Sequence, residues 1–406
     1  MNWTRAQINV VIAAYLGWTL DAFDFFLMVF VLKDIAAEFN TGIPAVALAI
    51  TLTLAARPVG ALIFGKLADK YGRRPTLMLD IGLYSILELL SGFSPNLLTL
   101  LVLRTLFGVA LGGEWGVGTA LAMETVPPRA RGFVSGLLQA GYPSGFLLAS
   151  IVFGTLYQHI GWRGMFFVGV IPALLVLYIR TSVPESPAFE AMVKTKRPGL
   201  WATFRQHWVL SLYCIVLMTA FNFFSHGTQD LYPTFLREQH HFDPHTVSLI
   251  VIVLNIGAII GGLTFGSLSE KIGRRRAICI AALIALPVLP LWAFSSGAFA
   301  LALGAFLMQI SVQGAWGVIP VHLNEISPPE IRATFPGFVY QLGNLLASVN
   351  ATVQASYAVD HGNNYGLGLA VVGGTAAVVI AVLIWFSHER HGVDMTHGAL
   401  QGAPVH

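Results

Sequence analysis

The sequence is short of charged residues. Only 11% of its 406 residues are Asp, Glu, Lys or Arg, whereas soluble globular proteins carry roughly 25%. Hydrophobic residues make up 55% of the chain, the mean hydropathy is +0.71, and the apolar residues lie in long runs along the whole length. Because about 20 apolar residues suffice for a helix to cross a bilayer, this composition excludes a soluble globular protein and predicts an integral membrane protein.

Cysteine is almost absent as well. Cys214 and Cys279 both fall within expected spans, so neither a disulfide nor a metal site is predicted from them. His240, His241 and His245 lie close together, but only Asp243 accompanies them as a possible ligand, and we expect a solvated loop there. The sequence shows no nucleophile with a base and no phosphate-binding loop. We therefore expect no enzyme activity, no cofactor, no metal and no nucleic-acid partner.

Twelve apolar stretches are long enough to be membrane helices. We expect them at about 8–32, 44–66, 76–94, 97–122, 132–157, 163–183, 208–234, 246–268, 277–296, 298–322, 333–358 and 366–387. Among the 23 Lys and Arg residues, Arg57 and Arg104 lie within spans, and only Lys33, Arg163 and Arg237 lie in loops on one side. The positive-inside rule places the other side, with both termini, in the cytoplasm. The first span has no small-residue cleavage site, so we expect it to be retained and not removed as a signal peptide.

The second half of the chain repeats the first. Gly65–Arg74 (GKLADKYGRR) recurs 201 positions later as Gly266–Arg275 (GSLSEKIGRR). At the same offset Gly113–Val117 (GEWGV) recurs as GAWGV, and Glu124–Arg131 (ETVPPRAR) recurs as EISPPEIR. Such a repeat predicts two related six-helix halves with a substrate site near the mid-plane of the membrane between them. We expect a first half at 1–183, a cytoplasmic linker at 184–207, a second half at 208–387 and a cytoplasmic tail at 388–406.

The repeated Gly-x-x-x-Asp-x-x-Gly-Arg-Arg segment resembles the cytoplasmic signature of the major facilitator superfamily. Its glycines permit a tight turn between helix ends, and its acidic and basic side chains can pair across helices when the cytoplasmic side is shut. An alternative is that the arginines only anchor the topology, but anchoring requires neither Asp69 nor the glycines. We expect a cytoplasmic gate formed by Asp69, Arg73, Arg74, Glu124, Arg131, Glu270, Arg274, Glu325 and Arg332.

Ionisable residues interrupt several spans of the first half, where they are energetically expensive and usually functional. Asp21 and Asp24 are three residues apart and share a helix face. Two carboxylates so close in a low dielectric do not easily both ionise, which suits them to carry a proton. The alternative is that they pair with Arg57 or lie near the water boundary. Arg57 keeps its charge and offers a planar fork that fits a carboxylate, so we expect it to bind an anionic substrate, unless it forms a permanent ion pair with Glu114 or Asp24.

Three other charged residues in these spans are less informative. Arg104 begins a ridge of small residues that suits close helix packing, and it resembles the helix-4 arginine of proton-linked facilitators. A structural role and a coupling role both remain open for it. No role is predicted for Asp80 or Glu88.

The seventh expected span carries a polar stripe. Asn222, His226 and Asp230 are spaced four apart with Gln229 beside them, so they lie on one helix face. Burying so many polar groups requires a wet cavity, although a closed network that only fixes packing is the alternative. A His–Asp pair can hold and pass a proton near neutral pH, and Asn222, Gln229 and Thr234 can hydrogen-bond a hydroxy or keto acid.

The stripe resembles the Asn-x-x-Ser/Thr-His-x-x-Gln-Asp-x-x-x-Thr signature of the Jen-type lactate and pyruvate permeases. These belong to the sialate/lactate:proton symporter family of the major facilitator superfamily, and the likeness extends through Trp316–Pro329 and Tyr340–Asn344. The resemblance implies an all-α membrane protein with twelve transmembrane helices in two pseudo-symmetric bundles, which carries a small monocarboxylate such as lactate or pyruvate together with protons by alternating access. It implies substrate binding by Arg57, Asn222, His226, Gln229, Gln341 and Asn344. With the charged residues above, we expect proton coupling by Asp21, Asp24, Glu114, His226 and Asp230.

Two rival functions remain. An acidic sugar such as sialate fits the same cytoplasmic signatures, although the complete stripe favours a monocarboxylate. A sensor that binds a carboxylate without moving it is the rival from another class, but we expect no soluble domain that could relay a signal. Because the chain lacks the long extensions and central loop of the yeast permeases, we expect a bacterial protein that lies in the inner (plasma) membrane as a monomer.

Overall fold

The computed structural model describes residues 3–41, 43–192, 200–232, 235–236, 239–362, 364–387, 389–390 and 392–393. Within these ranges the secondary structure is helical, without a strand. Large apolar side chains cover much of the outside, for example Phe299 (83% exposed) and Leu98 (72% exposed). A surface of this kind faces lipid, and helices suit it because each helix satisfies its own backbone hydrogen bonds.

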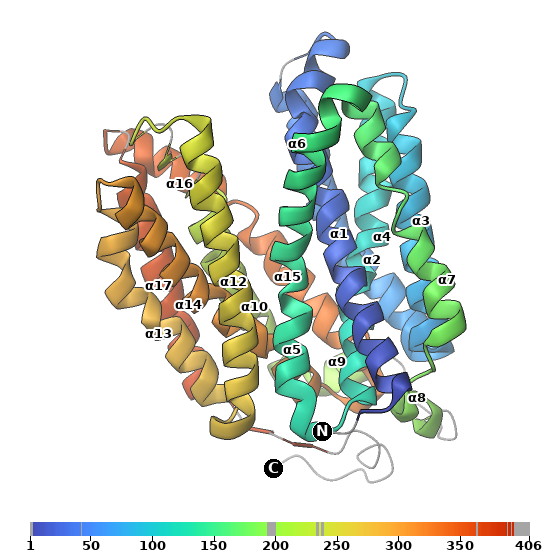
Figure 1. Ribbon diagram of the computed structural model, residues 1–406. Coiled ribbons are helices and arrows are strands. Elements are labelled where there is room, and N and C mark those ends of the chain that lie inside the picture. The colour runs from blue at the N-terminus through green and yellow to red at the C-terminus, as the bar shows by residue number, and fades with distance from the viewer. Residues whose placement is uncertain are drawn as a thin grey trace.

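The first half of the chain forms one bundle (Figure 1). Its helices are α1 (Arg5–Glu38), α2 (Ile43–Tyr71), α3 (Arg73–Gly92), α4 (Leu97–Thr125), α5 (Arg131–Gln139), α6 (Gly141–Val168) and α7 (Ala173–Ser182). Gly161 breaks α6, since its φ of 64° and ψ of −175° are not helical. The fifth expected span is therefore α5 with the first part of α6, and the sixth is the rest of α6 with α7.

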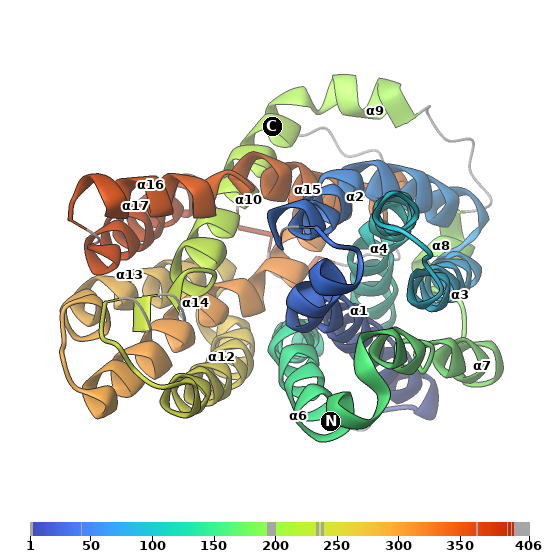
Figure 2. The same ribbon diagram turned by 90° about the horizontal axis from the view of Figure 1, so that it is seen from above.

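The second half forms another bundle beside the first (Figure 2). Its helices are α10 (Trp208–Gln229), α12 (Pro244–Ile272), α13 (Arg274–Ala293), α14 (Ala298–Ile326), α15 (Phe335–Ala347), α16 (Asn350–Asp360) and α17 (Tyr365–Trp385). Two short helices, α8 (Pro187–Met192) and α9 (Leu200–Gln206), lie in the chain between the bundles. The two-bundle architecture is confirmed, whereas the residue limits of the four segments stay a prediction.

In the described part of the chain, ten stretches are long and apolar enough to cross a membrane. The two other expected spans are α3 and the pair α15–α16. Helix α3 has a lower hydropathy because it carries Asp80 and Glu88 besides two arginines at its start. The helix break between Ala347 and Asn350 divides the other span into two short helices. Both spans pack within their bundles, α3 against α4 and α15 against α10, which completes the expected twelve.

The two bundles join at one end of the molecule. There α5 packs against α12 and α14, and α2 packs against α15; Figure 1 shows the bundles farther apart at the opposite end. Glycines permit the α5–α12 crossing, because a Cβ atom on Gly136 would overlap the carbonyl oxygen of Gly262. We call this end the terminal side: Gln7, near the start of α1, donates to Thr125 O at 3.4 Å, and Arg131 donates to Val393 O at 2.5 Å.

Candidate functional site

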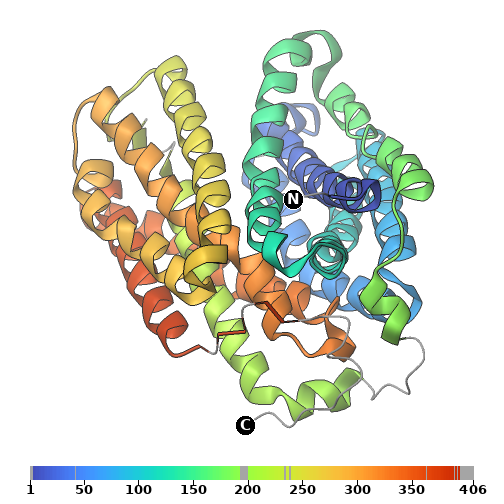
Figure 3. The same cartoon turned by 60° about the horizontal axis from the view of Figure 1, so that its bottom comes forward.

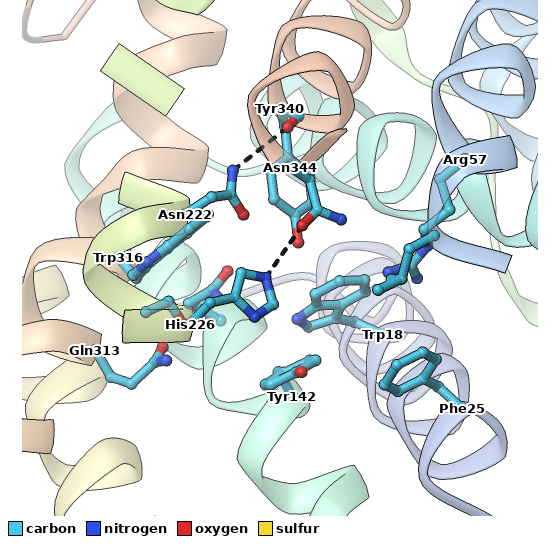
Figure 4. A pocket seen from close by; sticks show the side chains of 13 residues that line it. Trp18, Phe25, Arg57, Tyr142, Asn222, His226, Gln313, Trp316, Tyr340 and Asn344 are labelled. Atoms are coloured by element: carbon cyan, nitrogen blue, oxygen red, sulfur yellow. Dashed lines mark hydrogen bonds between the residues drawn. The ribbon is translucent and has the colours of Figure 1, made fainter. Parts of the chain in front are cut away.

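A cavity of about 450 Å³, including its opening to solvent, lies between the two bundles. From the first half, α1, α2, α5 and α6 line it with Trp18, Phe25, Leu54, Arg57, Gln139 and Tyr142. From the second half, α10, α14 and α15 line it with Asn222, Ser225, His226, Gln313, Trp316, Tyr340 and Asn344 (Figure 4). An interface of paired halves is where transporters of this architecture bind their substrates.

Arg57 reaches the cavity from α2 and is paired with Asp21 of α1. Its Nη2 lies 3.0 Å from both carboxylate oxygens of Asp21, and the two side chains are 6% and 0% exposed. Its Nε has no acceptor among the described residues. Arg57 thus holds one carboxylate through a single nitrogen and keeps a further donor for another. The sequence offered Glu114 and Asp24 as well as Asp21 as partners, and the structure places Asp21 there.

His226 of α10 joins two other predicted residues. Its Nδ1 lies 3.2 and 3.1 Å from the two carboxylate oxygens of Asp230. Its Nε2 lies 3.1 Å from Oδ1 of Asn344, a contact drawn in Figure 4. Both ring nitrogens face acceptors, an arrangement that a doubly protonated imidazole satisfies. The side chains of His226 and Asp230 are 24% and 41% exposed. Water, and therefore protons, can reach this pair.

Asn222 and Gln341 help to fix the wall of the cavity. The Asn222 amide donates to Met218 O at 2.8 Å and to Tyr340 O at 3.5 Å, so it links α10 to α15. Gln341 lies behind the lining and accepts from the Asn344 amide at 3.5 Å. Of the residues predicted to bind substrate, Arg57, Asn222, His226 and Asn344 line the cavity.

Gln229 is turned away from the cavity. Successive helical residues are about 100° apart, so Gln229 is displaced by about 60° from the face of His226. On that side α14 packs against α10, and the Gln229 amide donates to Gln309 Oε1 at 2.7 Å. The sequence pattern did not show that Gln229 points away, because the polar stripe covers a wider part of the helix surface than the part that faces the cavity. Thr234 lies outside the described residues.

The first half buries more acidic than basic groups. Asp21, Asp24, Asp80 and Glu88 are 0% exposed and Glu114 is 1% exposed, and the arginines buried near them in α2 and α4 are Arg57 and Arg104. Glu88 pairs with Arg104, whose guanidinium also lies 3.8 Å from the centroid of the Phe107 ring. The carboxyl oxygens of Asp24, Asp80 and Glu114 have no hydrogen-bond partner among the described residues. Burying an ionised carboxylate without a partner is very unfavourable, so these three groups are neutral acids in this state.

Aromatic rings form much of the cavity wall, and the sequence did not single most of them out. Trp18 stacks on Tyr142 with ring centroids 5.8 Å apart. Tyr340 lies 4.8 Å from Trp115 of the other half and 5.4 Å from Trp316. Aromatic residues in a membrane span also suit ordinary packing, so only a family resemblance marked Trp316 and Tyr340.

Two glutamines complete the wall, and the sequence analysis did not identify them. Gln139 and Gln313 line the cavity, and the Oε1 atom of each lacks a donor within the described ranges. The indole Nε1 of Trp18 likewise has no described acceptor. Buried polar groups normally find partners, so these atoms are available to hydrogen-bond water or a polar ligand in the cavity.

Figure 3 brings the terminal side, where the bundles join, toward the viewer. The predicted gate residues meet there. Asp69, near the end of α2, accepts from Ala333 N at 3.1 Å and from Thr334 N at 3.0 Å, just before α15. Glu270, near the end of α12, accepts from Gly132 N at the start of α5. Helix starts carry unpaired N–H groups and a partial positive charge. Each half therefore stabilises the start of a helix in the other half.

The other gate residues act mainly within one half. Arg73 lies 3.0 Å from Glu124, and Arg274 lies 3.1 Å from Glu325. Arg131 donates to Met123 O at 2.9 Å.

Arg74 and Arg332 complete the predicted gate. Arg74 donates to the carbonyl of Arg180, in its own half, while Arg332 lies within electrostatic reach of Glu124 in the other half. In the loop after α7, the Glu185 carboxylate accepts from Arg73 N at 3.0 Å. Burial raises the pKa of Glu185, although these backbone hydrogen bonds favour its charged form.

Asp69→Asn is expected to loosen the terminal side. The variant keeps the size of the side chain but removes the charge that faces the start of α15, an interaction worth about 1–2 kcal/mol. A cysteine at Ser135 reports the opening, because Ser135 Oγ donates to Gly317 O of the other half at 2.6 Å. In a background without Cys214 and Cys279, we expect maleimide to label Ser135→Cys about tenfold faster with Asp69→Asn than without it. Equal labelling rates, or the same increase with the exposed Asp360→Asn as a control, would contradict the role of Asp69.

Known proteins resemble the chain over nearly its whole length. The Major Facilitator Superfamily profile matches residues 12–235 and 215–402. A carboxylic acid transporter homolog of Saccharomyces cerevisiae is 29% identical over 97% of this chain and 69% of its own length. The sialic acid transporter NanX of Escherichia coli is 30% identical over 90% of each protein.

Solved structures share the fold. The proton:xylose symporter XylE superposes with a TM-score of 0.81 over 97% of this chain and 99% of that chain, at 19% identity. The human organic anion transporter MFSD10 superposes with a TM-score of 0.72 over 93% of this chain and 99% of that one, at 15% identity. These relatives are membrane transporters and not enzymes, as expected. The chain, a multi-pass membrane transporter, therefore belongs to the Major Facilitator Superfamily.

Proposed function

We propose that the protein is a symporter that carries one small monocarboxylate, such as lactate or pyruvate, together with a proton by alternating access. The observation that carries this proposal is the Arg57–Asp21 pair at a cavity that the His226–Asp230 pair faces from the other half. The cavity combines a permanent cation with carboxyl groups that can change their charge. This combination suits binding of an anion that depends on a proton.

Substrate binding would exchange one carboxylate for another on Arg57. Asp21 neutralises Arg57 in the empty cavity, and a substrate carboxylate that takes Arg57 leaves Asp21 without a cation. Asp21 then has to bind a proton, because an unpaired buried carboxylate is strongly disfavoured. The loaded cavity has the same net charge as the empty one, so closing it requires no additional burial of charge. The neutral Asp24 acid and the His226–Asp230 pair are the other groups that would share the proton.

The direction of access follows from the joined end. Asp69 and Glu270 hold the terminal side shut, so the cavity faces the opposite side in this state. The excess of Lys and Arg on the terminal side favours a cytoplasmic location for that side. The structure would then represent an outward-facing state of a monomer in the inner membrane of a bacterium.

The relatives support an organic acid as substrate. The yeast relative is named as a carboxylic acid transporter homolog. A further relative, from Cupriavidus pinatubonensis, is described as a probable 4-methylmuconolactone transporter and is 30% identical over 90% of this chain and 86% of its own length. We favour a small monocarboxylate because the sequence from Asn222 to Thr234 has every defined position of the permease signature.

A larger organic acid such as sialate is the second candidate. The sialic acid transporter NanX is 30% identical over 90% of this chain, and the cavity is open to solvent, with several polar side chains in its wall. Such an acid would still place its carboxylate on Arg57. Its hydroxyl groups would hydrogen-bond Gln139 and Gln313.

Uptake into proteoliposomes tests the proposal and separates the two substrates. The purified protein is reconstituted, a pH gradient (acid outside) is imposed, and labelled lactate and labelled sialate are compared with protein-free vesicles. We expect uphill accumulation of lactate that a protonophore collapses, and little accumulation of sialate. Accumulation of sialate alone would replace the substrate, and binding of lactate without uptake would support a sensor.

A further inference from the structure

A second, smaller cavity lies beside the buried acids. It encloses about 180 Å³ including its opening, and its lining includes Ala14, Trp18, Glu114, Trp115 and Leu138. Trp18 also lines the larger cavity, so the two cavities share this side chain. Ala14 of the small cavity lies nearer the start of α1 than Phe25 of the large one, and Thr119 of the small cavity lies near the end of α4. It therefore lies on the terminal side of the substrate cavity.

Glu114 places an unpaired acid at this second cavity. Its side chain belongs to α4, is 1% exposed and has no hydrogen-bond partner for either oxygen among the described residues. The carboxyl packs directly against Gly17 of α1, where an added Cβ would overlap Oε1 of Glu114. A glycine at this point thus makes room for the acid between the helices.

Asp80 of α3 is a second acid of the same kind. It is 0% exposed, and neither of its oxygens has a described partner. Glu114, Asp21 and Arg57 lie within its electrostatic reach. Tyr84, one turn further along α3, interacts electrostatically with Asp80 and Glu114 and also with Asp24.

The balance of charge makes both acids neutral here. Arg57 is the cation that Asp80 and Glu114 share as an electrostatic neighbour, and Asp21 already neutralises it at 3.0 Å. Ionising either acid would therefore place an uncompensated negative charge in the bundle. A proton held in this way can leave only when another proton replaces it or when water enters.

We propose that Glu114 is a proton-release site that connects Asp21 to the second cavity and through it to the terminal side. The inference rests on the proposed symport and adds its exit route. After the substrate leaves Arg57, Glu114 gives its proton to water in the second cavity. Glu114 then takes the proton of Asp21, whose carboxylate pairs again with Arg57. One proton is released, and Glu114 and Asp80 end protonated as they began.

Opening of the terminal side would control this release. Trp115 lines the second cavity, and its ring lies 4.8 Å from that of Tyr340 in the other half. Close by, Gly116 meets Gly337, where an added Cβ would lie 2.9 Å from the Gly337 Cα atom. When the halves separate at the terminal side, Trp115 loses this contact and water can enter the second cavity. The proton thus leaves only when the substrate can leave.

Glu114→Gln is the direct test, because an amide imitates a neutral acid. In proteoliposomes with a pH-sensitive dye inside, we expect the variant to retain exchange of labelled for unlabelled lactate. We expect it to lose at least about tenfold in lactate-driven acidification of the vesicle interior. Asp80→Asn, which leaves Glu114 in place, should keep most of the acidification rate. Wild-type acidification rates in Glu114→Gln would overturn the release site while leaving symport intact, whereas no acidification with the wild-type protein would overturn both.

The protonation state has its own readout, which does not depend on transport. Infrared spectra of the wild-type and Glu114→Gln proteins are compared at neutral pH. The variant should lack one carbonyl band of a neutral carboxylic acid that the wild type shows. Loss of a carboxylate band instead would overturn the proposal.

Glu88→Gln is the matched control, because Glu88 pairs with Arg104. That variant should lower the melting temperature, whereas Glu114→Gln should not.

Discussion

Arg57→Gln is expected to remove lactate binding almost completely. Losing one partner of a buried charge pair costs about 2–5 kcal/mol, which corresponds to a loss of affinity of at least about 30-fold. The substrate loses its cation, and Asp21 loses the group that holds both of its oxygens at 3.0 Å. Isothermal titration with lactate in detergent measures the effect directly.

The double variant Asp21→Asn/Arg57→Gln separates a substrate role from a structural one. Removing both members of a buried pair is often nearly neutral for stability, whereas removing one is not. We therefore expect a lower melting temperature for Arg57→Gln alone and a restored one for the double variant. Binding should remain lost in both. A double variant that transports lactate normally would show that Arg57 only holds α2 to α1.

Asp230→Asn is expected to abolish uphill uptake of lactate while part of the exchange remains. His226 Nδ1 lies 3.1 Å from the Asp230 carboxylate, which favours the charged ring. An asparagine at this position can still accept a hydrogen bond but no longer compensates the charge. We expect at least a tenfold drop in the accumulation ratio under an imposed pH gradient, measured against exchange in the same vesicles.

A matched substitution controls for this prediction. Asp243 is exposed in the described turn before α12 and accepts from Thr246 N at 3.2 Å. Asp243→Asn removes a charge near the same end of the bundle but away from the cavity, so its accumulation ratio should equal that of the wild type. If Asp230→Asn accumulates lactate as the wild type does, the His226–Asp230 pair takes no part in coupling.

The internal repeat made much of the fold predictable. Hydropathy marks the membrane spans, and the two copies of the glycine signature place α2 and α3 in correspondence with α12 and α13. Gly72 and Gly273 start the second helix of each pair with φ of 113° and 90°, a conformation that glycine adopts without strain. These features are local, and a sequence displays local features directly.

The repeat did not reveal every structural correspondence. Glu185 accepts from the backbone N of Arg73 at 3.0 Å, and Glu389 accepts from that of Arg274 at 3.2 Å. The two glutamates play the same part at the starts of α3 and α13. The repeat does not align these two glutamates, because they lie 204 positions apart in the chain, whereas the other matches lie 201 apart.

The partners of the buried charges could not be predicted. Spacing along a helix tells which residues share a face but not which neighbouring helix that face meets. Arg57 therefore had several possible partners before Asp21 was found beside it. No role was predicted for Asp80 or Glu88, because a lone acid in a span has no spacing pattern around it. The role of each acid depends on which arginine of α2 or α4 lies close to it, and the sequence does not show this.

Simultaneous measurement of lactate and proton flux tests the central claim most directly. Wild-type protein is reconstituted with a pH-sensitive dye inside, no pH gradient is imposed, and labelled lactate is added outside, with protein-free vesicles and Arg57→Gln as controls. Symport predicts acidification of the interior in step with lactate entry, at about one proton for each lactate. Lactate entry through the protein without acidification would contradict it.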